Sequence, residues 1–242
     1  MMLAPSLTAT LISGGRWYHW VTVVAWVTAY LAYMALRGVT SRRPRGYVGP
    51  LVTYTLLCLA AVVTLLTWRP ALVWWALPLA LLLAISSLLI AAGRERSVAN
   101  DAVMMALSCL MAVVIATLDR LGTGWSWAAY AGSTAPWLLA AVFAAYFWGT
   151  ITYVKCLIRE RGKTSWYVAS VVYHAALVVP GFLIHPAVGA VACLIVLRAA
   201  VVPRAWPKAK PKWIGLGEVA ITVVVMLVTA LTIAQWSAQA AV

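Results

Sequence analysis

Long apolar runs at a regular spacing constrain this chain more than any other feature. A helix of roughly 20 apolar residues crosses the bilayer core of about 30 Å. The chain divides into eight such runs with short polar breaks between them, at residues 17–36, 50–68, 71–92, 97–118, 135–158, 164–183, 186–202 and 214–236. A shorter apolar run, residues 1–12, precedes them, and we interpret it as the second half of one more helix.

The composition agrees with a membrane protein and excludes an ordinary soluble domain. Hydrophobic residues make up 65% of the 242 residues and charged residues 10%, whereas a soluble domain is about half apolar and a quarter charged. We therefore predict an all-α polytopic membrane protein of about nine transmembrane helices. It would form a single transmembrane domain over residues 1–242, with residues 1–16 holding the truncated first helix.

The basic residues predict the orientation of the spans. Arg16, Arg69 and Arg120 fall on one side of the predicted spans, and all other Lys and Arg residues fall on the opposite side. Because cytoplasmic loops collect Lys and Arg, we expect a bacterial inner-membrane protein with cytoplasmic basic loops and an outward C-terminus. The formal net charge of +13 then reflects topology and attraction to anionic lipids. We expect no nucleic-acid partner, since no basic run outside the spans alternates with aromatic residues.

The second half of the chain echoes the first, which suggests an internal repeat. At an offset of 116 residues Arg69-Pro70 matches His185-Pro186, and after one inserted residue Asp101 matches Glu218. The copies would be residues 17–118 and 135–236, each with four helices. Four crossings return the chain to its starting side, so the copies would be parallel, and sites in such proteins lie between the copies.

Polar residues inside the spans are the first candidates for function. Asp101 and Glu218 are each the fifth residue of a predicted span, and a carboxylate at this depth is costly unless it faces a partner or water. We expect both to face a cavity, together with Asn100, Tyr153 and His174 as polar or acid–base groups. For His174 the sequence leaves open a packing role and a proton relay.

A basic stripe near the end of the span at 135–158 is the second candidate. Lys155 and Arg159 lie one turn apart and, with Arg43 and Arg161, would bind an anionic headgroup. The alternative is that these cations only interact with the negative helix end or extend to the interface. The four cysteines lie in four different spans without the Cys/His spacing of zinc sites. We therefore expect no metal site and no cofactor.

Four further runs are distinctive: Gly93-Arg94-Glu95-Arg96 with Asn100-Asp101, the run from Tyr153 to Gly162, Tyr173-His174, and the run from Pro211 to Glu218. Together they resemble the YwiC-like family of bacterial membrane proteins. The resemblance extends over nearly the whole chain and implies no agreed activity. Family members carry a Gln-His-Gly-Ala-Trp-Ala stretch in the first helix. Here the sequence starts where that stretch would end, so the first helix either begins upstream of Met1 or lacks the stretch.

The overall plan is also similar to the UbiA superfamily of intramembrane prenyltransferases. That resemblance implies nine helices, a cytoplasm-facing central cavity, and functional loops after the second and sixth helices. UbiA enzymes carry Asp-rich magnesium motifs in those loops, whereas here residues 37–46 contain no acid and residues 159–163 contain one. The sequence therefore does not support magnesium binding in those loops, although their Arg and Lys could bind an anionic headgroup directly.

The sequence leaves three functions open. The first is binding or processing of an anionic isoprenoid-type lipid, such as a polyprenyl phosphate or diphosphate, by a carrier or by a prenyl-type transferase without Asp-rich motifs. The second is transport of a small solute, coupled to protons through Asp101, Glu218 and His174. The third is an assembly or scaffold role with a protein partner.

Overall fold

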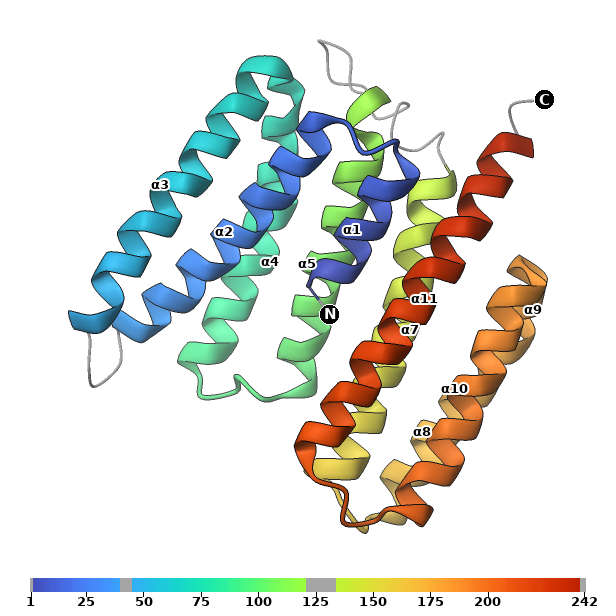
Figure 1. Cartoon of the computed structure of the whole chain (residues 1–242). Helices are drawn as coiled ribbons and strands as arrows, with labels where there is room; N and C mark the ends of the chain where they lie inside the picture. The colour runs from blue at the N-terminus through green and yellow to red at the C-terminus, as the bar shows by residue number, and fades with distance from the viewer. Residues whose placement is uncertain (1, 40–44, 121–133, 240–242) are drawn as a thin grey trace.

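The computed structural model describes residues 2–39, 45–120 and 134–239, and within them all regular structure is helical. The helices are α1 (Leu3–Ile12), α2 (Trp17–Val39), α3 (Arg45–Trp68), α4 (Val73–Ala91), α5 (Val98–Thr117), α7 (Thr134–Ile158), α8 (Thr164–Ala176), α9 (Val178–Ile184), α10 (Pro186–Ala205) and α11 (Pro211–Gln239), with short 3-10 turns η1 (Pro70–Leu72) and η2 (Leu118–Arg120). Eight segments of the described chain are long and apolar enough to cross a membrane. The predicted all-α polytopic membrane fold is confirmed (Figure 1).

The first helix is short, as expected, and begins part-way along the bundle (Figure 1). Gly14 and Gly15 follow it with φ values of 81° and 59°, a conformation that favours glycine, so the chain reverses tightly into α2. Although α1 packs between α5 and α11, it carries buried hydroxyls. Thr8 and Thr10 donate to carbonyls one turn earlier, at 2.9 and 3.0 Å, which satisfies these groups without a partner from another helix.

Proline residues determine where three of the helices begin or break. Arg69 and His185 both adopt extended backbone before a proline, as steric contact with the proline ring requires. Residues 164–183 were predicted as one continuous helix, but the structure divides this span at Leu177 into α8 and α9. Pro180 cannot donate to the carbonyl four residues earlier, and this explains the break.

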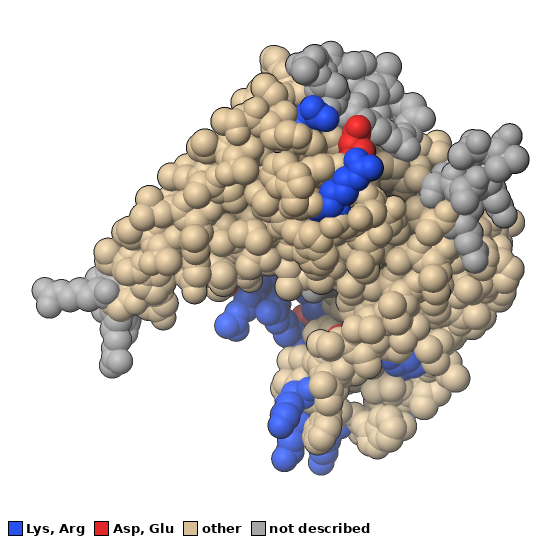
Figure 2. Space-filling view, turned by 45° about the horizontal axis from the view of Figure 1, so that its top comes forward, with Lys and Arg blue, Asp and Glu red and all other residues tan. Residues whose placement is uncertain are grey.

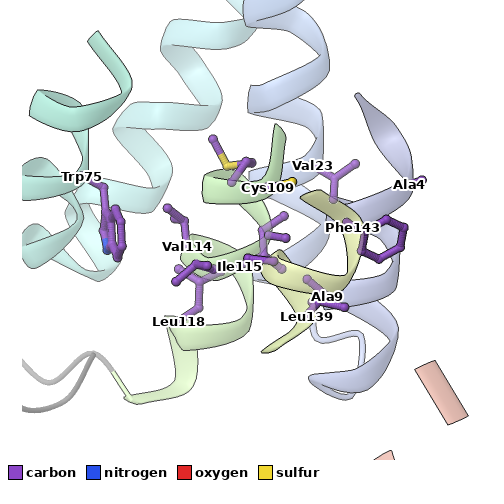
Figure 3. Close-up of a cluster of buried hydrophobic side chains, with 14 of the residues drawn as sticks. Ala4, Ala9, Val23, Trp75, Cys109, Val114, Ile115, Leu118, Leu139 and Phe143 are labelled. Carbon is purple, nitrogen blue, oxygen red and sulfur yellow. The ribbon is translucent and has the colours of Figure 1, made fainter. Parts of the chain in front are cut away.

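The helices fall into a first half, α2–α5, and a second half, α7–α11, which meet through α5 and α7. The main apolar core joins α1, α5 and α7 with parts of α2 and α4, and includes the fully buried Ile115, Leu139 and Phe143 (Figure 3). Pro70 begins η1 in the first half, and Pro186 begins α10 in the second half. The internal repeat itself stays a prediction.

The two ends of the bundle differ in charge. The connections 92–97, 159–163 and 206–210 lie at one end, and the α1–α2 turn and the α9–α10 turn lie at the other (Figure 1). The first group contains most of the basic residues of the described loops. We call it the basic end. Its assignment to the cytoplasm stays a prediction.

Candidate functional site

A cavity of about 720 Å³ lies between the two halves of the protein, and we call it the central cavity. Helices α5 and α11 form its sides, α1 covers it, and α7 contributes Thr150. Both predicted carboxylates line it. The complete lining is Met2, Leu3, Ala4, Leu7, Tyr30, Asp101, Met104, Met105, Ser108, Thr150, Glu218, Val219, Thr222, Val223 and Met226. The cavity is therefore apolar over most of its wall, with two acidic groups on opposite helices.

Asp101 forms an ion pair that connects the two halves. It lies in the first turn of α5, where the positive end of the helix dipole favours a carboxylate. The Lys155 ammonium on α7 lies 2.8 Å from its Oδ2, and the same ammonium donates to the Arg96 carbonyl at 3.4 Å. The Asp101 side chain is 31% exposed and that of Lys155 only 10%, so Lys155 lies behind the carboxylate, away from the cavity.

Glu218 is paired with a residue that the sequence analysis did not select. Arg198 on α10 contacts the Glu218 carboxylate through Nη1, and its guanidinium lies 4.1 Å from the centre of the Tyr153 ring. Both charged side chains are almost buried, at 11% and 13% exposure. A basic residue inside an apolar span, opposite a span with an acidic residue, was the signal that could have identified this pair.

The predicted headgroup-binding cations are held by backbone carbonyls as well as by Asp101. Arg159 is exposed and donates to the Arg96 carbonyl at 2.8 Å, beside Lys155. Arg161 donates to the carbonyls of Leu157 and Ala209, so it points toward α11 and not toward Lys155. Arg43 lies outside the described residues.

The remaining three predicted polar residues lie away from the central cavity. Asn100 accepts from the Ser86 hydroxyl at 2.8 Å and thereby connects α5 to α4. Tyr153 lies under Arg198. His174 is buried on α8, and its Nδ1 lies 2.7 Å from the Ser170 carbonyl. The ring of His174 also lies where a side chain at Gly149 would be, which shows how closely α7 and α8 approach.

Basic side chains surround the acidic groups at the surface. In the space-filling view a hollow separates two parts of the molecule, with Lys and Arg around it and acidic atoms inside it (Figure 2). The Arg37–Glu95 pair, at 2.7 Å, joins α2 to the α4–α5 connection in this basic region. No three His, Cys, Asp or Glu side chains of the described chain are grouped as metal ligands would be.

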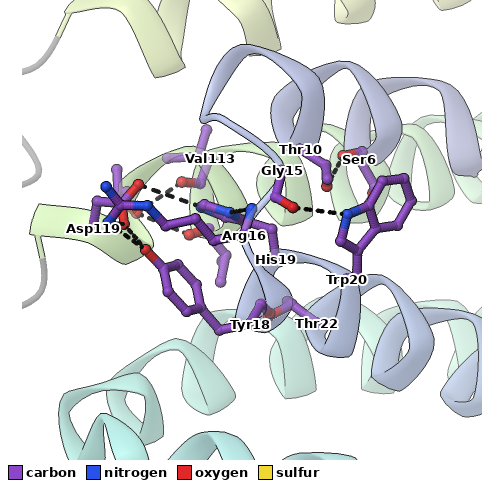
Figure 4. Close-up of polar contacts among 12 residues, drawn as sticks. Ser6, Thr10, Gly15, Arg16, Tyr18, His19, Trp20, Thr22, Val113 and Asp119 are labelled. Carbon is purple, nitrogen blue, oxygen red and sulfur yellow. Dashed lines mark hydrogen bonds and ion pairs between the residues drawn. The ribbon is translucent and has the colours of Figure 1, made fainter.

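A second polar cluster occupies the opposite end of the bundle and was missed by the sequence analysis. Asp119 accepts from the Tyr18 hydroxyl and from Arg16, and lies 3.5 Å from the buried ring of His19 (Figure 4). The hydrogen bond to Tyr18 and the charge of Asp119 raise the pKa of the Arg16 guanidinium. This cluster attaches the α1–α2 turn to the end of α5, so we assign it a structural role.

The comparison with known families concerns the part of the chain that contains Asp101. Residues 1–116 match the family described as YwiC-like protein. Over these residues, just under half of the chain, the protein is similar to the YwiC-like family. The predicted resemblance is confirmed for this YwiC-like part, which ends one residue before the end of α5, whereas the runs quoted from residues 153–162, 173–174 and 211–218 lie outside the match. No curated protein and no solved structure matches the chain.

Proposed function

We propose that this membrane protein binds an anionic isoprenoid-type lipid, such as a polyprenyl phosphate or diphosphate, in the central cavity. The basic end would face the cytoplasm of a bacterial cell, and the lipid would enter from the inner membrane. The observation that carries the proposal is the lining of the central cavity. Its long wall is apolar, and its charged groups are confined to the part nearest the basic end.

The apolar wall suits a flexible chain. Met104, Met105 and Met226 line the central cavity from α5 and α11, and methionine side chains adapt to irregular apolar ligands. Since α1 packs against both α5 and α11, it covers the cavity on the side away from the basic end. A lipid tail would therefore lie under α1, between the two halves.

The headgroup would bind by exchange with Asp101. Lys155 is a nearly buried cation whose ammonium is paired with Asp101, a carboxylate that lines the central cavity. Arg159 lies beside Lys155, is exposed, and uses one N–H on the Arg96 carbonyl, so most of its five donors are available to a phosphate. A phosphate that displaced Asp101 would bind both cations, and Asp101 could then act as an acid–base group next to the ligand.

The test is native mass spectrometry of the purified protein with extraction of the bound lipid. Replacement of Lys155 and Arg159 by alanine should remove a copurifying polyprenyl phosphate or diphosphate. Arg94→Ala is the matched control, because Arg94 is an exposed cation at the same end whose side chain, unlike those of Lys155 and Arg159, is not bonded to the Arg96 carbonyl. Equal lipid in all variants would contradict the proposal, and a persistent second polypeptide would favour the assembly role.

Asp101→Asn gives a sharper test because competition predicts a gain. The amide cannot form an ion pair with Lys155, so the cation becomes available and lipid retention should rise. The matched variant is Arg198→Met/Glu218→Gln, which also removes one cavity carboxylate without leaving a buried charge unpaired, and which leaves Lys155 paired with Asp101. Lipid retention should not rise in this double variant. An equal response of the two variants would contradict the exchange.

Proton-coupled transport is the second candidate, because Asp101 and Glu218 line one cavity from opposite helices. Carboxylates at membrane depth are typical coupling groups. In proteoliposomes this function predicts solute uptake that depends on a pH gradient and is lost in Asp101→Asn. Solute uptake that does not depend on the pH gradient and is unchanged in Asp101→Asn would contradict this function. His174 lies outside the central cavity, so this candidate rests on the two carboxylates.

A further inference from the structure

A second pocket, which we call the side pocket, lies between α10 and α11 at the basic end and has a volume of about 780 Å³. It is separate from the central cavity, although Glu218 borders both. Its mouth is lined by Trp206, Lys208 and Trp213, and its inner wall by Arg198 and Glu218. The proposed function does not use this pocket.

The inner wall offers hydrogen-bond donors that the protein does not use. Arg198 contacts Glu218 through Nη1 and stacks over Tyr153. Its Nε and Nη2 atoms are buried and have no hydrogen-bond partner among the described residues. Buried donors without a partner are costly. An acceptor oxygen at the inner wall would satisfy them, whereas Glu218 contacts Arg198 only through Oε1, and its Oε2 is also buried without a partner among the described residues.

The mouth has the character of a bilayer interface. Trp206 and Trp213 are exposed, and exposed tryptophans at helix ends are typical of the headgroup level. Lys208 is exposed between them. Arg198 lies seven residues before the last residue of α10, so at 1.5 Å per residue the inner wall lies about 10 Å below the mouth.

We propose that the side pocket binds an anionic glycerophospholipid of the leaflet at the basic end. Its phosphate would pair with Lys208 at the mouth. Its ester carbonyls, which lie deeper than the phosphate, would accept from Arg198, and its acyl chains would run along the apolar surface of α10 and α11. Lys208 at the mouth and Arg198 below it are arranged like the phosphate of a glycerophospholipid and the ester carbonyls that lie deeper. Basic pockets between membrane helices are known to bind anionic headgroups.

The experiment compares phosphatidylglycerol with phosphatidylcholine as probes for the delipidated full chain, by native mass spectrometry and thermal unfolding in detergent. Wild-type protein should bind one phosphatidylglycerol molecule in preference to phosphatidylcholine. Its unfolding temperature should be higher when phosphatidylglycerol is bound. Lys208→Ala should lower that adduct about five-fold. Ala205→Trp should also lower it, because Ala205 is exposed and lines the side pocket, so the indole would fill the site without a change of charge.

The control is Lys210→Ala, which removes the same charge from the same loop but does not line the side pocket. It should retain the adduct. Equal adducts in wild type, Lys208→Ala and Ala205→Trp would overturn the proposal, and so would an equal stabilisation by inorganic phosphate alone, which would indicate a free-anion site. The Lys155 and Arg159 double variant should leave this adduct unchanged, so failure here and failure of the proposed function give different results.

Discussion

Asp101 on α5 and Glu218 on α11 line the same central cavity, yet their surroundings differ. The Asp101–Lys155 pair joins the two halves, is partly exposed on the carboxylate side, and lies at a helix N-terminus. The Glu218–Arg198 pair lies within the second half, about two turns into α11, and is nearly buried. In the first pair, a ligand or water can replace one of the two charged partners. In the second pair, such a replacement would leave a nearly buried charge unpaired.

This difference shows that the position of a carboxylate in a span does not determine its role. A buried ion pair adds little net stability when intact, because desolvation opposes the attraction, but removal of one partner is very costly. A pair with access to water tolerates such a loss better. We therefore assign ligand exchange to Asp101 and a mainly structural role to Glu218.

The largest expected effect is from Arg198→Met, which leaves Glu218 buried and unpaired. We expect the free energy of unfolding in mixed detergent micelles to fall by about 3–5 kcal/mol. The double variant Arg198→Met/Glu218→Gln removes both charges and should recover most of the loss. A single variant as stable as wild type would show that water reaches Glu218, and the contrast between the two pairs would not hold.

Lys155→Met should have a smaller effect, a loss of about 1–2 kcal/mol in the same unfolding measurement. Asp101 keeps the favourable helix N-terminus and access to the cavity, so its charge can be hydrated after the ammonium is removed. A loss as large as that of Arg198→Met would mean that the two carboxylates are equally buried.

Tyr153→Leu tests the support that the aromatic ring gives to Arg198. The guanidinium lies over the ring, and such contacts contribute about 0.5–2 kcal/mol. We expect a loss of about 1 kcal/mol in unfolding free energy. The matched variant Tyr153→Phe keeps the ring and should lose less. If the two variants lose the same amount, the hydroxyl or the cavity left behind, and not the cation–π contact, matters.

The smallest expected effect is from salt. In double-mutant cycles, the coupling energy of Asp101 with Lys155 should fall by a few tenths of a kcal/mol between about 0.05 M and about 1 M NaCl. The coupling of Glu218 with Arg198 should stay constant, since buried pairs are screened less. A salt effect of equal size on both pairs would contradict the difference in burial.

Much of the fold was predictable because apolar length is a property of the chain alone. A run long enough to cross the bilayer must form a helix there, since no water is present to bind the free backbone groups. The eight spans and the short α1 therefore matched the prediction. The break at Leu177 was not predicted, because the hydropathy of residues 164–183 is continuous and only the missing N–H of Pro180 divides it.

The site was predictable in part. The cost of a carboxylate at membrane depth identified Asp101 and Glu218, and both line the central cavity. Their partners were not predicted. Lys155 was expected to bind a ligand and pairs with Asp101, and Arg198 was counted only as a topological charge. Pairing depends on which helix faces which, and local sequence does not encode that.

The sequence by itself determined that the chain is a membrane helix bundle with one basic end and two carboxylates within its spans. These features follow from hydropathy, length and charge, which act locally along the chain. Only the tertiary structure decided how exposed each carboxylate is at the central cavity and which cation it is paired with. Long-range packing between α5, α7, α10 and α11 sets the solvent access and the partner of each charge, and those two quantities control its energy.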